Sequence, residues 1–326
     1  MTFTDLNKLN MDSLSEIISL TVGLVGEMQR GATVLAGIDN KTPIVTFTAK
    51  GKALRKSTGC DGVYKYTEMA NNVEYYDFQP VELPIVVCLQ DLWGKMVAKG
   101  IHLSDDFSET ELAGFMASEV LKVLEADLLR LAWLDGDKDA IAAEYNIFKK
   151  GGFLKQMAAS KEQVLTLTLN TEDDTGVVRT MKKLIDSQRP DQKENSEFFV
   201  TSNVMRIFKD FVQQKDNHIA QMIMMDGKPE YYLEGYKINE LPHVSASMIA
   251  DATKTEAFIA FTPKTNIQIV LEDSNVNIKP FLQDAQTRRY YSTTVFAADV
   301  MVAVPGIMKL AIKCKSGKTE NNGVSN

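Results

Sequence analysis

The chain has 326 residues, of which 44% are hydrophobic and 24% charged, the composition of an ordinary globular protein too long for a single compact core. Its formal net charge of -7 argues against a dedicated nucleic-acid binder, because neutralising phosphates requires a basic surface, although loose contact with DNA stays open. The longest uncharged runs, residues 17–26 and 241–250, have ten residues each, about half of what a membrane-spanning helix needs, so no membrane segment is expected.

The first 40 residues are expected to form an arm rather than a domain. A short capped helix is predicted from Ser13 to Gln29. Gly31, Gly37 and the Asp-Asn pair at 39–40 then indicate a hinge and a turn.

The next segment predicts strands that leave the main body. Residues 44–48 are typical of a strand, and so are 73–78 and 81–89. Pro80 and Pro84 confine these last segments to sheet edges or bends, because proline cannot donate to a sheet.

The same region is basic in an acidic protein. Between residues 41 and 68, six Lys or Arg oppose two acidic residues, a local charge of +4. Lys50, Lys52, Arg55 and Lys56 make up most of this excess. An isolated two-stranded ribbon has no core to bury. The segment is therefore either a solvated loop or a long hairpin that lies on an acidic neighbour.

A long helix is predicted from Ser108 to Leu134, roughly 40 Å at 1.5 Å per residue. Ser108 and Glu111 form a capping box, and Gly136 lies where a left-handed C-terminal cap is favoured. Apolar residues recur at three- and four-residue spacing: Leu112, Phe115, Met116, Val120, Val123, Leu124, Leu128 and Leu131. This spine helix is expected to pack one face on a core.

The second half alternates helices and strands before it ends in strands. Helices are predicted at 176–187 and 203–214, around a strand at 198–202. The other predicted strands are 165–169, 231–233, 236–241, 257–261, 267–271, 288–296, 300–304 and 307–312.

Motifs for catalysis or metal binding are missing from the sequence. The acidic run at 135–140 has Ala140 where a calcium loop requires glycine and Asn146 where it requires glutamate, so a helix-terminus turn is the better interpretation. His102, His218 and His243 lie apart from one another and from the cysteines. Neither a nucleophile elbow nor a phosphate-binding or dinucleotide-binding glycine loop is present. We expect no cofactor and no metal, and an enzyme only if distant residues assemble a site.

The remaining sulfur-containing residues carry less information. Cys60, Cys88 and Cys314 lie far apart, which suits a reducing compartment, and no signal peptide is indicated. Five methionines are interpreted as adaptable core or interface residues rather than ligands: Met222, Met224, Met225, Met248 and Met301.

The order of these elements resembles the major capsid protein of tailed bacteriophages, the Hong Kong 97-type fold that encapsulins share. The likeness is strongest from Glu256 to Ile312, where Phe281 leads one stretch, Arg288 and Arg289 open a long strand, and a valine strand runs into residues 304–305. Residues 198–211 are similar to the family's strand followed by an asparagine and a helix.

Two further segments extend the resemblance to about residues 80–312. Residues 233–244 are similar to the family's glycine, strand and proline segment, and residues 92–96 (LWGKM) precede the spine helix as in the family. The first 40 residues are shorter than the fused scaffolding segment of longer members, so a separate scaffold, or none, is implied.

The resemblance implies an α+β fold with a spine helix, a peripheral domain, an axial domain and an extended β-hairpin loop that reaches over a neighbouring subunit. The implied divisions are an arm (1–40), the extended loop (41–80), a peripheral domain with the spine helix (81–159), an axial domain (160–260), return strands of both domains (261–312) and a flexible tail (313–326). Lys50, Lys52, Arg55 and Lys56 would then contact the neighbour.

The implied function is structural rather than enzymatic. Pentamers and hexamers of one chain would form the icosahedral shell around the double-stranded DNA of a tailed phage or prophage. Portal and scaffolding proteins would be partners, DNA would be touched only weakly, and the virion would be assembled in the bacterial cytoplasm. An encapsulin-like compartment and, from another class, an α/β enzyme with a nonlocal active site are the alternatives.

Overall fold

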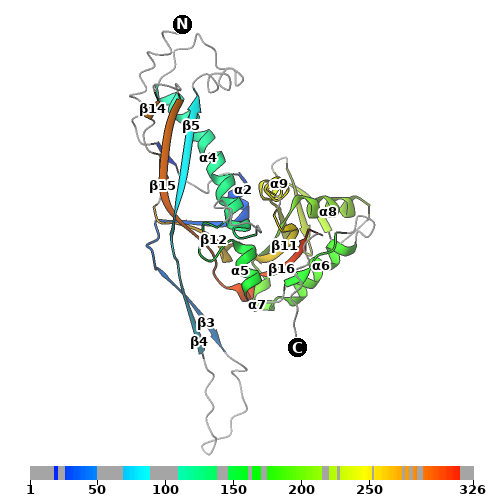
Figure 1. Cartoon of the computed structure of the whole chain (residues 1–326). Coiled ribbons are helices and arrows are strands. Elements are labelled where there is room, and N and C mark those ends of the chain that lie inside the picture. Colours follow the sequence, from blue (N-terminus) through cyan, green and yellow to red (C-terminus); the bar gives the residue numbers. More distant parts are fainter. Residues whose placement is uncertain are drawn as a thin grey trace, which may run out of the picture.

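The computed structural model describes residues 18–20, 26–49, 69–88, 109–137, 146–160, 164–169, 175–214, 220–225, 228–251, 253–273, 276–278, 282–284 and 289–315. Figure 1 shows an elongated body with a compact lobe on one side. A long ribbon and the spine helix extend in one direction, and a narrow hairpin extends in the opposite direction. The fold is α+β, as expected from the sequence.

The spine helix is α4 (Glu109–Leu134), which confirms the predicted helix. It lies beside the ribbon of β5 (Gln79–Cys88) and β15 (Arg289–Val302), which pair antiparallel over ten residues (Figure 1). Strands β14 (Leu282–Asp284), β12 (Ile267–Leu271) and β2 (Thr33–Ala36) complete this five-stranded sheet. Among the described strands β5 pairs only with β15, which agrees with the edge position predicted from Pro80 and Pro84.

The lobe contains a seven-stranded mixed sheet. Its order is β6 (Val164–Thr166), β16 (Lys309–Cys314), β11 (Thr255–Pro263), β7 (Ser196–Val200), β10 (Tyr236–Glu240), β9 (Lys228–Leu233) and β8 (Ala220–Met225). The helices of this half of the chain are α5 (Phe153–Ala159), α6 (Thr175–Ser187), α7 (Pro190–Lys193), α8 (Ser202–Gln214) and α9 (Pro242–Ala250).

Strand β11 separates two hydrophobic cores, because successive side chains point to opposite faces of a strand. Ile259 and Phe261 join a core with residues of α6 and α8. Phe258 and Ala260 join a larger core with residues of α4, α5 and α9. Both faces of this sheet are therefore covered.

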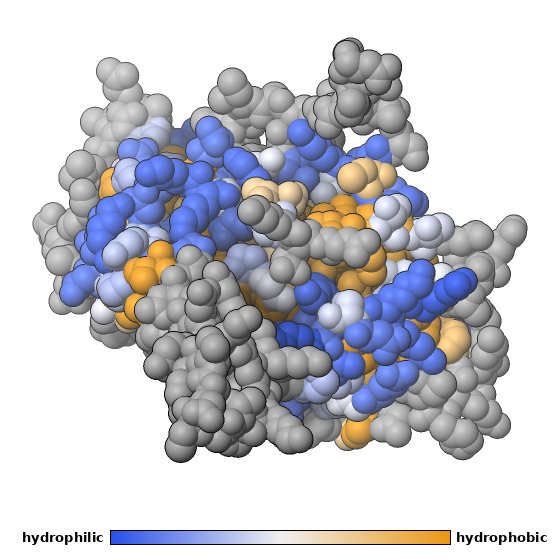
Figure 2. All heavy atoms as spheres, turned by 90° about the horizontal axis from the view of Figure 1, so that it is seen from below, coloured by the Kyte–Doolittle hydropathy of each residue, from blue (hydrophilic) through white to orange (hydrophobic). Residues whose placement is uncertain are grey.

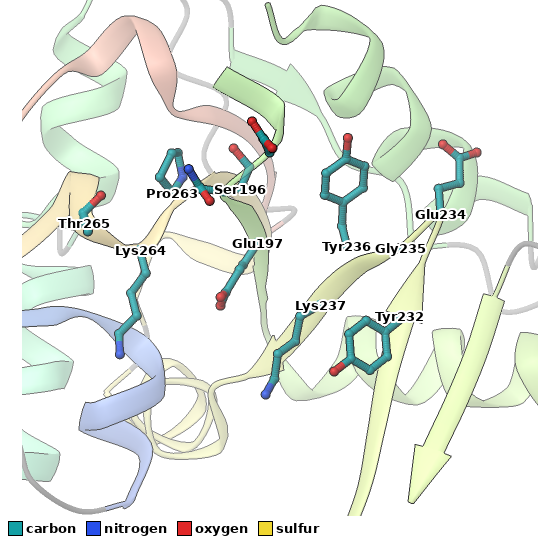
Figure 3. A pocket seen from close by; sticks show the side chains of 12 residues that line it. Ser196, Glu197, Tyr232, Glu234, Gly235, Tyr236, Lys237, Pro263, Lys264 and Thr265 are labelled. Atoms are coloured by element: carbon teal, nitrogen blue, oxygen red, sulfur yellow. The ribbon is translucent and has the colours of Figure 1, made fainter. Parts of the chain in front are cut away.

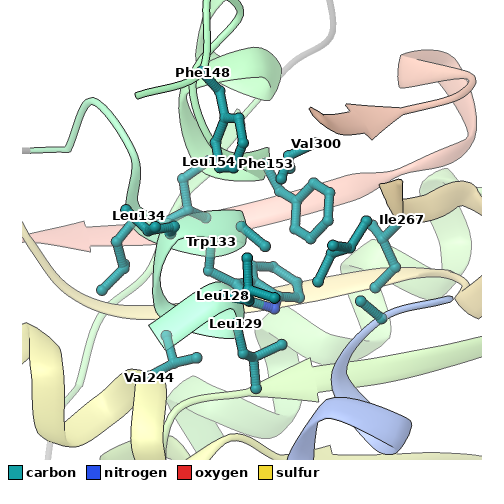
Figure 4. Packing of buried hydrophobic residues seen from close by; sticks show 14 of the residues in the cluster. Leu128, Leu129, Trp133, Leu134, Phe148, Phe153, Leu154, Val244, Ile267 and Val300 are labelled. Carbon is teal, nitrogen blue, oxygen red and sulfur yellow. The ribbon is translucent and has the colours of Figure 1, made fainter. Parts of the chain in front are cut away.

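The carboxyl end of α4 lies in the centre of the larger core (Figure 4). Trp133 stacks on Phe258 with ring centroids 4.8 Å apart and meets Phe153 edge to face at 5.1 Å. Leu128 and Leu129 are completely or almost completely buried. Aromatic contacts of this kind add to the free energy of burial, so this end of the helix is firmly held.

The amino-terminal prediction was partly wrong. Instead of one helix from Ser13 to Gln29, the structure has strand β1 (Ile18–Leu20), paired with β13 (Val276–Ile278), and a short helix α2 (Gly26–Gly31). The expected hinge also contains β2, which pairs parallel to β12. Long-range strand pairing outweighs local helical periodicity here, and β-branched residues such as Ile18 favour strands.

Other elements also differ from the prediction. Strands predicted at 288–296 and 300–304 are one strand, β15, because pairing with β5 and β12 carries the chain through Asp299. Helices α5 and α9 were not predicted: Pro242 begins a helix rather than only ending a strand, as proline is tolerated in a first helical turn. Strand β16 runs to Cys314, two residues into the segment expected as tail.

Candidate functional site

Strands β3 (Pro43–Ala49) and β4 (Met69–Tyr75) form the predicted hairpin, which projects away from the rest of the molecule (Figure 1). Their antiparallel register runs from Pro43 opposite Tyr75 to Ala49 opposite Met69. The facing pair Val45 and Val73 is 47% and 43% exposed. These two valines place exposed apolar surface on one face of the ribbon.

The predicted contact residues Lys50, Lys52, Arg55 and Lys56 lie outside the described residues. They belong to the segment that joins the ends of β3 and β4.

The near end of the hairpin, its root, rests on a small hydrophobic cluster. Tyr76 and Phe78 pack with Val270 of β12 and Met301 of β15. The Tyr76 hydroxyl also donates to the Gln268 side chain at 2.7 Å. The root is thus attached to the elongated sheet.

Ion pairs surround Asp77 at the root. Lys41 and Lys149 both donate to its carboxylate, the latter at 2.9 Å. Beside it, Lys150 donates to Glu74 at 3.0 Å. Hydrogen bonds from Lys41 and then from Lys149 lower the pKa of Asp77 to about 2, so this carboxylate stays charged at neutral pH.

The backbone that precedes Lys149 and Lys150 is hydrogen-bonded to the residue that follows the spine helix. Asp135, at the end of α4, accepts hydrogen bonds from the backbone N–H of Ile147 and of Phe148, at 3.2 and 2.9 Å. Phe148 is buried in the larger core. Burial raises the pKa of Asp135, since these two hydrogen bonds compensate only part of the loss of water.

A second carboxylate connects the root to β15. Asp299, 1% exposed, accepts from the backbone N–H of Asp77 at 2.9 Å and of Val300 at 2.8 Å. Burial raises the pKa of Asp299. The hairpin root is therefore bonded both to Lys149 and Lys150, in the segment that follows α4, and to Asp299 of β15.

Solved structures share the overall fold of this chain. No protein-family model matches the chain, and no curated protein sequence matches it either. A chain of the capsid of Myoviridae phage XM1 superposes with a TM-score of 0.54 at 10% identity, covering 96% of this chain and 98% of that one. A chain of the satellite phage P4 procapsid gives 0.52 at 9% identity, with 95% and 99% covered.

A chain of the capsid of a native GTA particle gives a TM-score of 0.51 at 11% identity, covering 91% of this chain and 93% of that chain. The fold is that of phage capsid proteins. The Hong Kong 97-type fold expected from the sequence is thereby confirmed, with its spine helix and extended hairpin.

The acidic turn after α4 serves the capsid fold as a structural cap. Gly136 has a φ of 80°, the left-handed conformation expected for it. Asp137 accepts from the Thr255 backbone N–H at 3.1 Å and from its hydroxyl at 2.9 Å. In the described parts of the chain, no group of three or more His, Cys, Asp or Glu residues could hold a metal ion.

The variant Asp137→Asn is expected to change how stability depends on pH. Burial raises the pKa of Asp137 from 3.8 to about 6. The folded state then binds this proton more tightly than the unfolded state does. The contribution of Asp137 to the free energy of unfolding is therefore greatest below about pH 4 and is lost as the pH rises through 6. The excess stability of wild type over the variant should fall by about 2 kcal/mol between pH 4 and 7.5.

Urea unfolding of both proteins at the two pH values measures this difference. Other carboxylates titrate equally in both chains and cancel. A constant difference between wild type and variant would contradict the role assigned to Asp137.

A cavity of about 680 Å³ opens on the lobe of this capsid fold (Figure 3). Its lining comes from the ends of β7, β9, β10 and β11 and includes Glu197, Tyr232, Lys237 and Lys264. Asn239 donates to Glu197 at 2.6 Å, and Lys237 donates to Glu230 at 2.6 Å. Glu197 and Lys237 of the lining are therefore each bonded to a neighbouring side chain.

The methionines divide into two groups. Met248 and Met301 are buried, whereas Met222 and Met224, on the edge strand β8, are 53% and 62% exposed.

Seen from below, the described surface is mainly hydrophilic with hydrophobic areas between (Figure 2). None of the described helices is both long enough and apolar enough to span a membrane.

Proposed function

We propose that this chain is a major capsid protein, which self-assembles as pentamers and hexamers into an icosahedral shell around the double-stranded DNA of a tailed phage or prophage. The observation that supports this most is the extent of the fold match, which spans 96% of this chain and 98% of a chain from a phage capsid. A match over nearly both full lengths leaves little chain for an added activity.

The divisions of the shell subunit follow the same proposal. Residues 81–159 would form the peripheral domain and 160–260 the axial domain, with 261–312 returning through both. The smaller core, which contains α6 and α8, supports a unit within residues 160–260, whereas α9 of that range packs in the larger core with α4. Residues 1–40 would be the arm, and the tail would begin after β16, which ends at Cys314.

The hairpin would be the contact to the neighbouring subunit, made by Lys50, Lys52, Arg55 and Lys56. Its local charge of +4 within a chain of -7 means that any copy of this protein offers it an acidic surface on average. Repeating one modest contact around a closed shell multiplies its effect on stability.

Other partners follow from the same role. A portal and a scaffolding protein would complete the shell, and packaged DNA would touch the acidic subunit only weakly and without sequence preference. The assembled protein would belong to the virion, after assembly in the cytoplasm of the bacterial host.

Assembly tests the proposal directly. The chain, expressed alone and together with the proteins encoded beside it, is purified by size-exclusion chromatography and imaged by negative-stain microscopy. Rings, tubes or shells in either preparation support a capsid protein. A uniform monomer or dimer in both preparations would overturn the proposal, and shells that hold a cargo protein would instead support an encapsulin-like compartment.

A further inference from the structure

The hairpin has few attachments that could set its direction. Within the described part of the chain, β3 and β4 pair only with each other, and no third strand supports them. A two-stranded ribbon of this kind does not hold an orientation by itself. Its direction relative to the body must therefore be decided at the root.

The apolar contacts of the hairpin are confined to its root. Tyr76 and Phe78 pack on β12 and β15 where the chain leaves the sheet, and Ile44 at the start of β3 packs against the same cluster. Beside these apolar contacts, ion pairs join the root to residues 149 and 150. Lys149 reaches Asp77 at 2.9 Å, and Lys150 reaches Glu74 at 3.0 Å and the Tyr75 carbonyl oxygen at 3.5 Å.

We propose that Lys149 and Lys150 form a salt-sensitive latch, which fixes the direction of the hairpin by pairing with Asp77 and Glu74. The latch is anchored in the body, because Asp135, directly after α4, accepts hydrogen bonds from the backbone N–H groups of residues 147 and 148. Lys41 shares Asp77 from within the hairpin root, and Asp299 holds the Asp77 backbone from β15. The direction of the hairpin is thereby coupled to the end of the spine helix.

The strength of the latch suits a reversible device. Lys150 and Glu74 are each about one-third exposed, at 33% and 32%, and Lys149 is 72% exposed. Pairs with this much exposure are individually weak and are screened by salt. They can select one orientation among several of similar energy without being needed for folding. If the chain forms shells as proposed, the latch presents a preset hairpin to the next subunit.

Distance measurements on the unassembled, full-length subunit test the latch. Spin labels carried by non-natural amino acids replace Val45 on the hairpin and Ile249 on α9, which are 47% and 81% exposed. At about 0.1 M salt, wild type should give one narrow distance distribution. At about 1 M salt, where the Debye length is about 3 Å, the distribution should broaden.

Charge reversal gives the decisive comparison. Lys150→Glu should broaden the distribution at low salt, and adding Glu74→Lys should restore the narrow distribution by re-forming the pair with opposite polarity. Lys183→Glu, an exposed lysine of α6, is the matched control and should have no effect. An unchanged distribution in Lys150→Glu, or a failure of the double variant to restore it, overturns the latch. Because no assembly is measured, this result is independent of whether the chain forms shells.

Discussion

Replacing Leu124 with aspartate is expected to abolish folding of the subunit. Leu124 is 3% exposed on the face of α4 that packs into the larger core. A buried carboxylate without a partner costs several kcal/mol, a large part of the roughly 5–15 kcal/mol that stabilises a typical domain. The soluble fraction after expression and the circular dichroism of any soluble protein measure the effect.

The adjacent residue provides a matched control. Val123 is 64% exposed on the solvent-facing side of the same helix. Val123→Asp is expected to leave the free energy of unfolding within about 0.5 kcal/mol of wild type. Equal behaviour of the two variants would mean that the buried face of α4 has been assigned incorrectly.

Reversing the charge of three basic residues between β3 and β4 is expected to impair assembly of shells while leaving the subunit folded. The triple variant Lys50→Glu, Lys52→Glu and Lys56→Glu changes the local charge of residues 41–68 from +4 to -2, because each substitution removes two units. The reversed hairpin would then repel an acidic neighbour. Thermal unfolding should match wild type, whereas shells should be rare by negative-stain microscopy.

A charge-preserving variant isolates the cause. Substituting arginine at the same three positions keeps the +4 charge and should give normal shells. Normal shells from the glutamate variant would remove the assignment of these residues to the subunit contact, although the capsid fold itself would be unaffected.

Several elements could be predicted because their signal is local. The capping residues and apolar spacing of α4 lie within one segment, and so do the turn at Gly136 and the +4 charge of the hairpin. The capsid fold was expected from the resemblance of these elements, and above all of residues 256–312, to a known family. The amino-terminal strand β1 was missed because its partner, β13, lies more than 250 residues away.

The hairpin root shows most clearly what the linear sequence leaves open. Nothing near Asp77 in the chain indicates that its partners include Lys149, or that Asp299 accepts from its backbone 222 positions away. Charged surface residues pair through three-dimensional proximity and leave no periodic pattern. Local chemistry in the sequence thus determined the spine helix, the basic hairpin and the type of fold, whereas only tertiary packing decided how the hairpin is held.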